Sequence, residues 1–154
     1  MTGSPAYLAA LDLRGRHVLV ASAGRVAERR IPALLDAGAL VHVVAPHATA
    51  AVRAWADAGV LTWSPRPVED SDATGVWYAQ ALTDAPAVNA AVVAACATQR
   101  VFCVRGDDGR AGTARTPATG TVDDLTIGVV GDRDPRRSAR ARDAAVRAVA
   151  DAFG

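Results

Sequence analysis

Short apolar runs alternate with amphipathic stretches over the first two-thirds of the chain. Five such runs are present, at residues 17–22, 39–45, 60–63, 76–82 and 101–105. Their near-continuous Val, Leu and Ala content is typical of strands buried on both faces of a parallel sheet. Three stretches with a helical pattern lie between these runs, at residues 25–37, 48–58 and 86–98. This alternation predicts an α/β fold: a Rossmann-type parallel sheet with right-handed crossovers.

Glycine and proline mark the limits of the first predicted helix. Gly24 begins it, and Gly38 follows it as a helix-ending residue. Pro32 lies inside the helix and is expected to kink it or strain its first turns. Residues 64–72 are predicted to form a loop, because Pro, Ser and Asp dominate them.

The pattern changes beyond the fifth apolar run. Residues 106–120 are rich in glycine and threonine, residues 125–131 read as a strand, and an amphipathic helix with an arginine-rich face begins at Pro135. We therefore predict two parts: a Rossmann dinucleotide-binding domain over 1–110, and a small C-terminal α+β segment over 111–154.

Composition narrows the class of protein. Of 154 residues, 51% are hydrophobic but only 5% aromatic, so the core is built mainly from Ala, Val and Leu. The net charge of +1 gives no indication of a nucleic-acid or membrane partner. Lysine is absent, which excludes Schiff-base chemistry and a P-loop lysine.

The cysteines and the N-terminus bear on the compartment. Cys96 and Cys103 lie in or beside apolar runs, as buried free thiols do in a reducing environment. The first residues lack the order of a signal peptide, and no apolar stretch is long enough to span a bilayer. We expect a cytoplasmic protein. The three dispersed histidines and two cysteines have no metal-ligand spacing, so no metal site is predicted.

The turn after the first strand is the first candidate site. A dinucleotide fingerprint has the form G-x-G-x-x-G/A, because small residues let the backbone approach the pyrophosphate at a helix N-terminus. The matching hexamer here runs from Ser22 to Ala27, with Gly24 in the middle and serine in place of the first glycine. The hexamer by itself is equally compatible with a strand–turn–helix that binds nothing.

The end of the second strand leaves the choice of dinucleotide open. The carboxylate that usually binds the adenine ribose is missing there, and Ala45, Pro46 and His47 occupy its place. Arg25, in the first turn of the helix, can contact a 2′-phosphate. NAD and NADP therefore both remain compatible with these residues.

Several segments, taken in order, resemble the precorrin-2 dehydrogenase family, the dehydrogenase/ferrochelatase module of siroheme synthase. They are GRHVLVASAGRVAERRIPALLDAGALVHVVAP at 15–46, ALTD at 81–84 with Val88-Asn89, VFCV at 101–104, the strand at 125–130 and the helix from Pro135. The resemblance covers roughly residues 7–152. It implies that precorrin-2 is oxidised to sirohydrochlorin with hydride passing to NAD, and that some relatives then insert ferrous iron. It also implies a homodimer formed through the segment after the nucleotide domain, with the tetrapyrrole near that interface.

The resemblance also assigns residues. The cofactor positions that it implies are the turn over the pyrophosphate, the loop near the adenosine ribose and the loop beside the nicotinamide: Ser22, Ala23, Gly24, Arg25 and Val26; Pro46 and His47; and Thr83. Asp107 matches the family's aspartate implicated in dehydrogenation and chelation. A carboxylate can accept the proton lost as hydride leaves. A second carboxylate, Asp108, is expected to raise the pKa of one of the pair; the alternative is a solvated turn before Gly109.

Departures from the family pattern define the competing hypotheses. Ser22 replaces a glycine, Val104 an asparagine and Gly131 a serine. The second hypothesis is therefore a catalytically degenerate dinucleotide- or tetrapyrrole-binding module, or a scaffold of a longer siroheme synthase. A third is another Rossmann protein, such as a potassium-channel regulatory domain, although those usually have an intact fingerprint and an acid ending the second strand.

The basic face of the last helix has two readings. Its arginines can bind the carboxylates of precorrin-2 through bidentate pairs, or form a solvated face balanced by aspartates. They are Arg133, Arg136, Arg137, Arg140 and Arg142.

Overall fold

The computed structural model describes residues 6–131 and 134–153. The chain folds as two compact units. One is Leu11–Ala114, and the other combines Arg115–Gly154 with Met1–Ala10. No helix among the described residues has the length and apolarity needed to cross a membrane.

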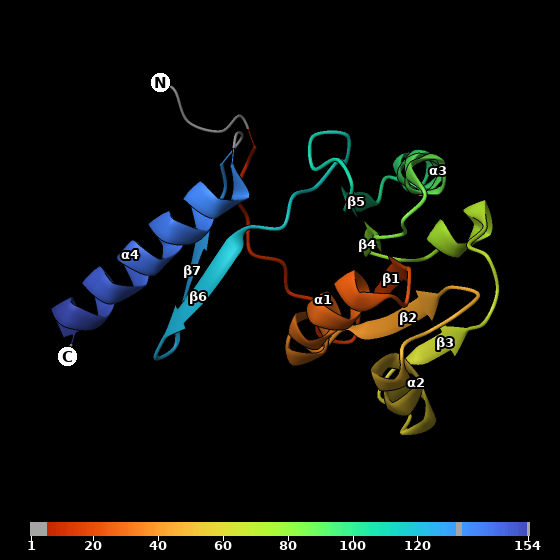
Figure 1. Cartoon of the computed structure of the whole chain (residues 1–154), viewed down its shortest axis with the longest axis horizontal. Helices are drawn as coiled ribbons and strands as arrows, with labels where there is room; N and C mark the ends of the chain where they lie inside the picture. Colours follow the sequence, from red (N-terminus) through yellow and green to blue (C-terminus); the bar gives the residue numbers. More distant parts are fainter. Residues whose placement is uncertain (1–5, 132–133, 154) are drawn as a thin grey trace. The chain divides into compact units, whose positions relative to one another are not determined.

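A five-stranded parallel sheet forms the first unit, in the order β3-β2-β1-β4-β5 (Figure 1). Its strands are β1 (His17–Ala21), β2 (Leu40–Val44), β3 (Thr62–Ser64), β4 (Tyr78–Ala81) and β5 (Phe102–Arg105). The helical elements between them are α1 (Arg25–Asp36), α2 (Ala50–Asp57), the 3-10 helix η1 (Asp70–Ala73) and α3 (Pro86–Thr98). The predicted Rossmann-type α/β fold is confirmed.

The alternation of side chains along β1 divides the core into two layers. Val18 and Val20 face one side, where they pack with Ile31 of α1. Leu19 faces the other side, where it packs in the same cluster as Cys96 of α3. Since successive side chains of a strand point to opposite faces, α1 and α3 cover opposite faces of the sheet. Both cysteines are free and buried, as predicted.

Two local features of this unit bear on the predictions. Helix α1 is continuous from Arg25 to Asp36 and includes Pro32. Pro32 is exposed, so the Glu28 carbonyl that loses its usual donor lies on the side where water can replace it. Residues 64–72 are not entirely loop, because η1 begins within them. A capping box between Glu69 and Asp72 stabilises its start.

The second unit is a hairpin with one long helix. Strand β6 (Ala118–Val122) pairs antiparallel with β7 (Leu125–Val129), and α4 (Pro135–Phe153) lies along the hairpin (Figure 1). At Gly120, a Cβ would lie 2.7 Å from side-chain atoms of both Arg142 and Val146, so glycine lets helix and hairpin approach closely. None of the described residues of α4 is fully buried.

Candidate active site

The candidate site lies at the carboxyl ends of β1, β4 and β5. The chain adds strands outward from β1 to β3 and then returns to β4 beside β1, so strand order reverses between β1 and β4. Ligands of open α/β sheets bind in the crevice outside such a switch point. Two backbone hydrogen bonds align the loops there: the Leu82 amide donates to the Ala21 carbonyl (3.0 Å), and the Gly106 amide to the Ala81 carbonyl (2.8 Å).

The turn after β1 has the small residues that a pyrophosphate requires. Ala23 and Ala27 are buried, and Gly24 precedes α1 with no side-chain cap. A Cβ at Gly24 would have only the Ser22 hydroxyl oxygen within 4 Å, at 3.6 Å. The first amides of a helix have no partner within the helix and bind anions readily. The turn therefore fits a dinucleotide phosphate, which its residues would hold through backbone amides.

Ser22 adopts an unusual backbone conformation in this turn. Its φ of 151° lies in the region that favours glycine. Its buried hydroxyl oxygen accepts a hydrogen bond from the Gly24 amide at 3.2 Å. The hydroxyl thus takes the hydrogen bond of one backbone amide in the turn. The backbone of Ser22 keeps a conformation typical of the glycine that it replaces.

This conformation predicts an inverted order of stability among Ser22 variants. We expect Ser22→Gly to be more stable than Ser22→Ala by about 1 kcal/mol, because both lose the hydroxyl and only glycine relieves the backbone. At an ordinary strand or helix position, alanine is the more stable residue by about 0.5–1 kcal/mol. Urea unfolding followed by tryptophan fluorescence reports on this unit, which contains Trp55, Trp63 and Trp77. Alanine proving the more stable would contradict the strain assigned to Ser22.

The segments predicted to lie near the adenosine follow β2 and begin α1. Pro46 and His47 follow β2 and are exposed, and Arg25 is exposed in the first turn of α1 beside the half-buried Val26. The Thr49 amide donates to the Ala23 carbonyl at 3.0 Å, which ties the loop after β2 to the turn after β1. The structure thus joins these two predicted segments at the same edge of the sheet.

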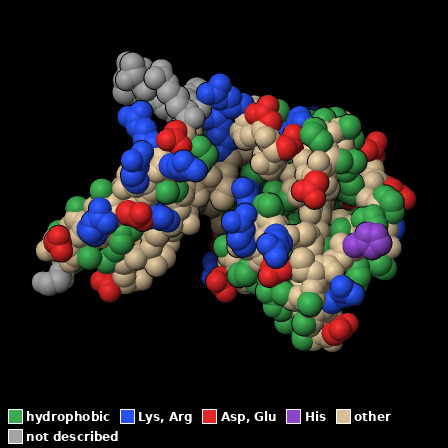
Figure 2. Space-filling model, in the orientation of Figure 1, with side chains coloured by type: hydrophobic (Ala, Val, Ile, Leu, Met, Phe, Trp, Pro, Cys, Tyr) green, Lys and Arg blue, Asp and Glu red, His purple; other side chains and the backbone are tan. Residues whose placement is uncertain are grey.

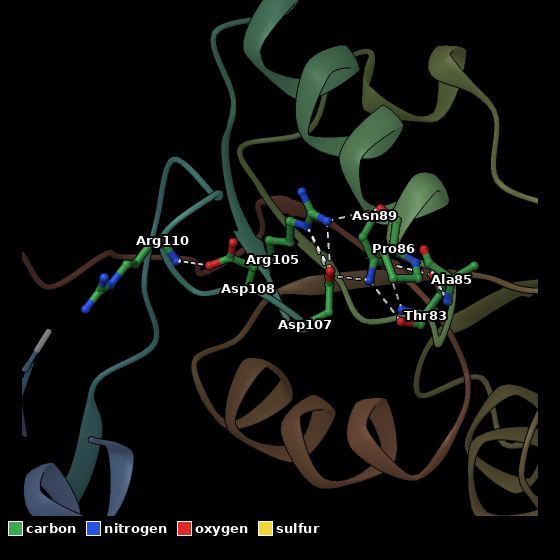
Figure 3. Close-up of polar contacts among 8 residues, drawn as sticks. All are labelled: Thr83, Ala85, Pro86, Asn89, Arg105, Asp107, Asp108 and Arg110. Carbon is green, nitrogen blue, oxygen red and sulfur yellow. Dashed lines mark hydrogen bonds and ion pairs between the residues drawn. The ribbon is translucent and has the colours of Figure 1, made fainter. Parts of the chain in front are cut away.

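Asp107 lies in a cluster of polar contacts at the end of β5 (Figure 3). Arg105 donates from Nε to Oδ1 at 3.0 Å and from a terminal nitrogen to Oδ2 at 2.8 Å, and Asn89 donates from Nδ2 to Oδ1 at 2.6 Å. Gly106 makes this arrangement possible, because a Cβ there would lie 2.9 Å from the Leu82 side chain. The hydrogen bond from Arg105 and then that from Asn89 lower the pKa of Asp107 to about 2.

The expectation that Asp108 raises the pKa of its neighbour is wrong for Asp107. Arg105 and Asn89 dominate its surroundings, and Asp108 is engaged elsewhere. Its Oδ1 accepts the Arg110 amide at 3.0 Å, and the two carboxylates do not share a hydrogen bond in Figure 3. Asp107 is therefore an ionised carboxylate within an ion pair.

Asn89 of α3 connects Asp107 to the Thr83 loop. Its side chain is fully buried. Its Oδ1 accepts from the Thr83 amide at 3.0 Å and from the Thr83 hydroxyl at 2.7 Å, and its Nδ2 also donates to the Thr83 carbonyl at 2.9 Å. The side-chain amide of Asn89 therefore holds both the Thr83 loop, which is expected beside the nicotinamide, and the Asp107 carboxylate.

Asn89 and Arg105 both contact Asp107, although neither is among the site residues predicted from the sequence. An asparagine in an alanine-rich helix, and a cation ending an apolar strand two residues before an aspartate, are signals that point to them. The arginines predicted for the basic face belong to the second unit. Of these, Arg136, Arg137 and Arg140 are exposed and Arg142 contacts the Thr119 carbonyl and Asp143, while Arg133 lies outside the described residues. Figure 2 shows cationic side chains along this helix.

Fold and site together define a dinucleotide-binding protein of the Rossmann class. The model of a family described as "Putative NAD(P)-binding" matches residues 9–118, and the chain belongs to that family. This agrees with the predicted cofactor, NAD.

Individual relatives confirm the resemblance. A siroheme synthase from Xylella fastidiosa (strain M12) is 38% identical over 119 residues, which are 77% of this chain and 25% of that one. A siroheme synthase from Escherichia coli O1:K1 / APEC is 42% identical over 92 residues, or 60% of this chain and 20% of that one. The chain thus spans about a quarter or less of these relatives. The solved structure of SirC, precorrin-2 dehydrogenase, superposes with a TM-score of 0.77 at 28% identity, covering 90% of this chain and 69% of that one.

Proposed function

We propose that this chain is an NAD-dependent precorrin-2 dehydrogenase that forms sirohydrochlorin. The observation that carries the proposal is the position of Asp107. An ionised carboxylate follows β5, at the same edge of the sheet as the switch point between β1 and β4, and hydrogen bonds join its loop to β4 and α3, in a fold similar to that of SirC. Two similarities to siroheme synthases support the same pathway of tetrapyrrole chemistry.

The residues divide the work of the reaction. The turn from Ser22 to Val26 would hold the pyrophosphate of the dinucleotide. Pro46 and His47 would contact its adenosine ribose, and Thr83 would lie beside its nicotinamide. Oxidation of precorrin-2 removes a hydride and a proton; a bound NAD would supply the hydride acceptor, and Asp107 is the group that takes the proton. The products are sirohydrochlorin and NADH. The proposal concerns dehydrogenation alone.

Turnover of precorrin-2 tests the proposal directly. The full chain is mixed with precorrin-2 and NAD, and NADH and sirohydrochlorin are followed by absorbance. We expect both products in equal amounts. A folded protein that binds NAD in calorimetry but forms neither product would support the degenerate binding module instead. Replacement of NAD by NADP in the same assay measures the preference between the two.

We also propose that the chain forms a homodimer through its second unit. A two-stranded hairpin is marginal in isolation, and α4 contributes no fully buried side chain to cover it. Large apolar side chains remain exposed in this unit, Leu125 at 45% and Phe153 at 75%. A second copy that covers this surface would supply the missing core.

Sedimentation equilibrium checks the dimer. We expect the wild-type chain to have twice the monomer mass, and Leu125→Glu to weaken association at least tenfold, because it places a charge on the apolar surface. Val60→Glu is the matched control, since Val60 is 49% exposed in the first unit. A monomeric wild-type chain, or an equal effect of both variants, would contradict association through the second unit.

A further inference from the structure

Arg105 makes an extensive set of contacts with Asp107 that the proposed reaction by itself does not require. Its side chain, 16% exposed, ends β5 and reaches both oxygens of the Asp107 carboxylate. The same terminal nitrogen also donates to the Pro86 carbonyl at 3.2 Å, at the start of α3. The other terminal nitrogen makes none of the contacts drawn in Figure 3 and points away from Asp107.

This pairing makes the free protein poorly prepared for proton transfer. The paired carboxylate has a pKa of about 2, so its proton affinity is well below that of an ideal base at neutral pH. The charged groups around it are few. Arg105 faces it from β5, Asp108 lies beside that pair, and α3 contributes the neutral Asn89 amide and the Pro86 carbonyl. Arg105 is thus the group whose movement changes Asp107 most.

A substrate with carboxylate side chains offers Arg105 another partner. Guanidinium binds carboxylates in bidentate fashion, and its planar fork can exchange one carboxylate for another of the same geometry. Precorrin-2, the substrate of the proposed function, carries such side chains. An exchange would leave Asp107 with only the neutral donor Asn89, so that its affinity for a proton rises as substrate arrives.

We propose that Arg105 is a positioning residue that is exchanged between two carboxylates. It holds Asp107 as an ion pair in the free protein, and it binds a carboxylate of the incoming substrate, which releases Asp107 to accept the proton. The inference rests on the proposed function and deepens it by naming the group that recognises the acidic periphery of the substrate. No atom is transferred in the exchange itself.

Titration of Asp107 by carbon NMR tests the exchange without any turnover. With labelled aspartate, and Asp107→Asn to assign the resonance, we expect the pKa of about 2 in the wild-type chain to rise when an octacarboxylate porphyrin, uroporphyrin, is added. In Arg105→Met the pKa is expected to be higher already, by a tenfold or larger gain in proton affinity, and to respond little to the porphyrin. Arg105→Lys keeps the charge but loses the bidentate fork, so an intermediate value is expected.

Affinity for the same porphyrin gives the second arm. We expect Arg105→Met to weaken binding at least tenfold, and the control Arg53→Met, an exposed arginine on α2, to leave it unchanged. An Asp107 resonance unmoved by bound porphyrin in the wild-type chain overturns the exchange, and that arm needs no variant to fold. Exchange in a chain that does not oxidise precorrin-2 would refute the proposed function alone, whereas turnover that is normal in Arg105→Met would refute the inference alone.

Discussion

Replacing Asp107 by alanine is expected to lower kcat/KM for precorrin-2 oxidation by about 100-fold or more, the usual contribution of a positioned proton acceptor. The affinity for NAD should stay within about threefold, because the dinucleotide turn is formed by residues after β1 and not by Asp107. Initial rates of NADH formation at varied precorrin-2 concentration give the first quantity, and calorimetry with NAD gives the second.

Two further variants separate proton acceptance from structure. Asp107→Asn keeps an oxygen for the hydrogen bonds from Arg105 and Asn89 but cannot take a proton at neutral pH, so we expect it to be as inactive as alanine. Asp108→Ala is the matched control, since Asp108 bonds to the Arg110 amide outside the cluster, and its activity should stay within about twofold. Wild-type activity in Asp107→Asn would show that another group accepts the proton.

The sheet could be predicted from the sequence because its strands are short runs of apolar residues that recur at regular intervals along the chain. At least half of the residues are buried in β1, β2, β4 and β5, whereas β3 has none, and glycines and prolines between the apolar runs mark the turns. Strand β6 lacked this signal. Its residues, ATGTV, alternate small and polar groups, since Gly120 must be small to admit Val146 and the other face has no apolar partner within the hairpin. The pattern therefore predicted only β7 of this pair.

The location of the candidate site could be predicted from the sequence, but the charge environment of Asp107 could not. The order of strands places Ser22, Thr83 and Asp107 at one edge whatever their chemistry, so a resemblance spread over several segments was sufficient to find them. The ion pair of Asp107 depends on side-chain geometry: Gly106 lets the chain turn closely past Leu82, and Arg105 and Asp107 then meet. Adjacent aspartates in a sequence suggest repulsion, whereas the folded chain gives Asp107 a cation and an amide.

In the fingerprint turn, too, the backbone conformation could not be inferred from the residue type. Ser22 keeps a backbone angle typical of glycine, so the loss of that glycine from the sequence does not remove the turn. Serine in place of the first fingerprint glycine is therefore weaker evidence for a degenerate module than the sequence alone suggests.

Replacing Asn89 by alanine is expected to destabilise the first unit by about 3 kcal/mol. The variant removes a fully buried side chain and leaves the amide and carbonyl of the half-buried Thr83 without their partner, and each unsatisfied group costs about 1–3 kcal/mol when buried. Urea unfolding followed by tryptophan fluorescence measures the free energy of unfolding. Gln99→Ala, at the exposed end of the same helix, should change it by less than about 0.5 kcal/mol.

Asn89→Asp separates the role of the Asn89 side-chain oxygen from that of its side-chain nitrogen. An aspartate retains the oxygen that accepts from the Thr83 amide and hydroxyl, but it turns a second oxygen toward the Thr83 carbonyl and the Asp107 carboxylate. The two carboxylates then repel each other when both are ionised, so we expect this variant to regain stability as the pH falls from 7 toward 5 and the new acid takes up a proton. Asn89→Ala has no such group and should not show this gain. Equal pH dependence in the two variants would mean that Asn89 does not face Asp107, and the link between the Thr83 loop and the proton acceptor would be lost with it.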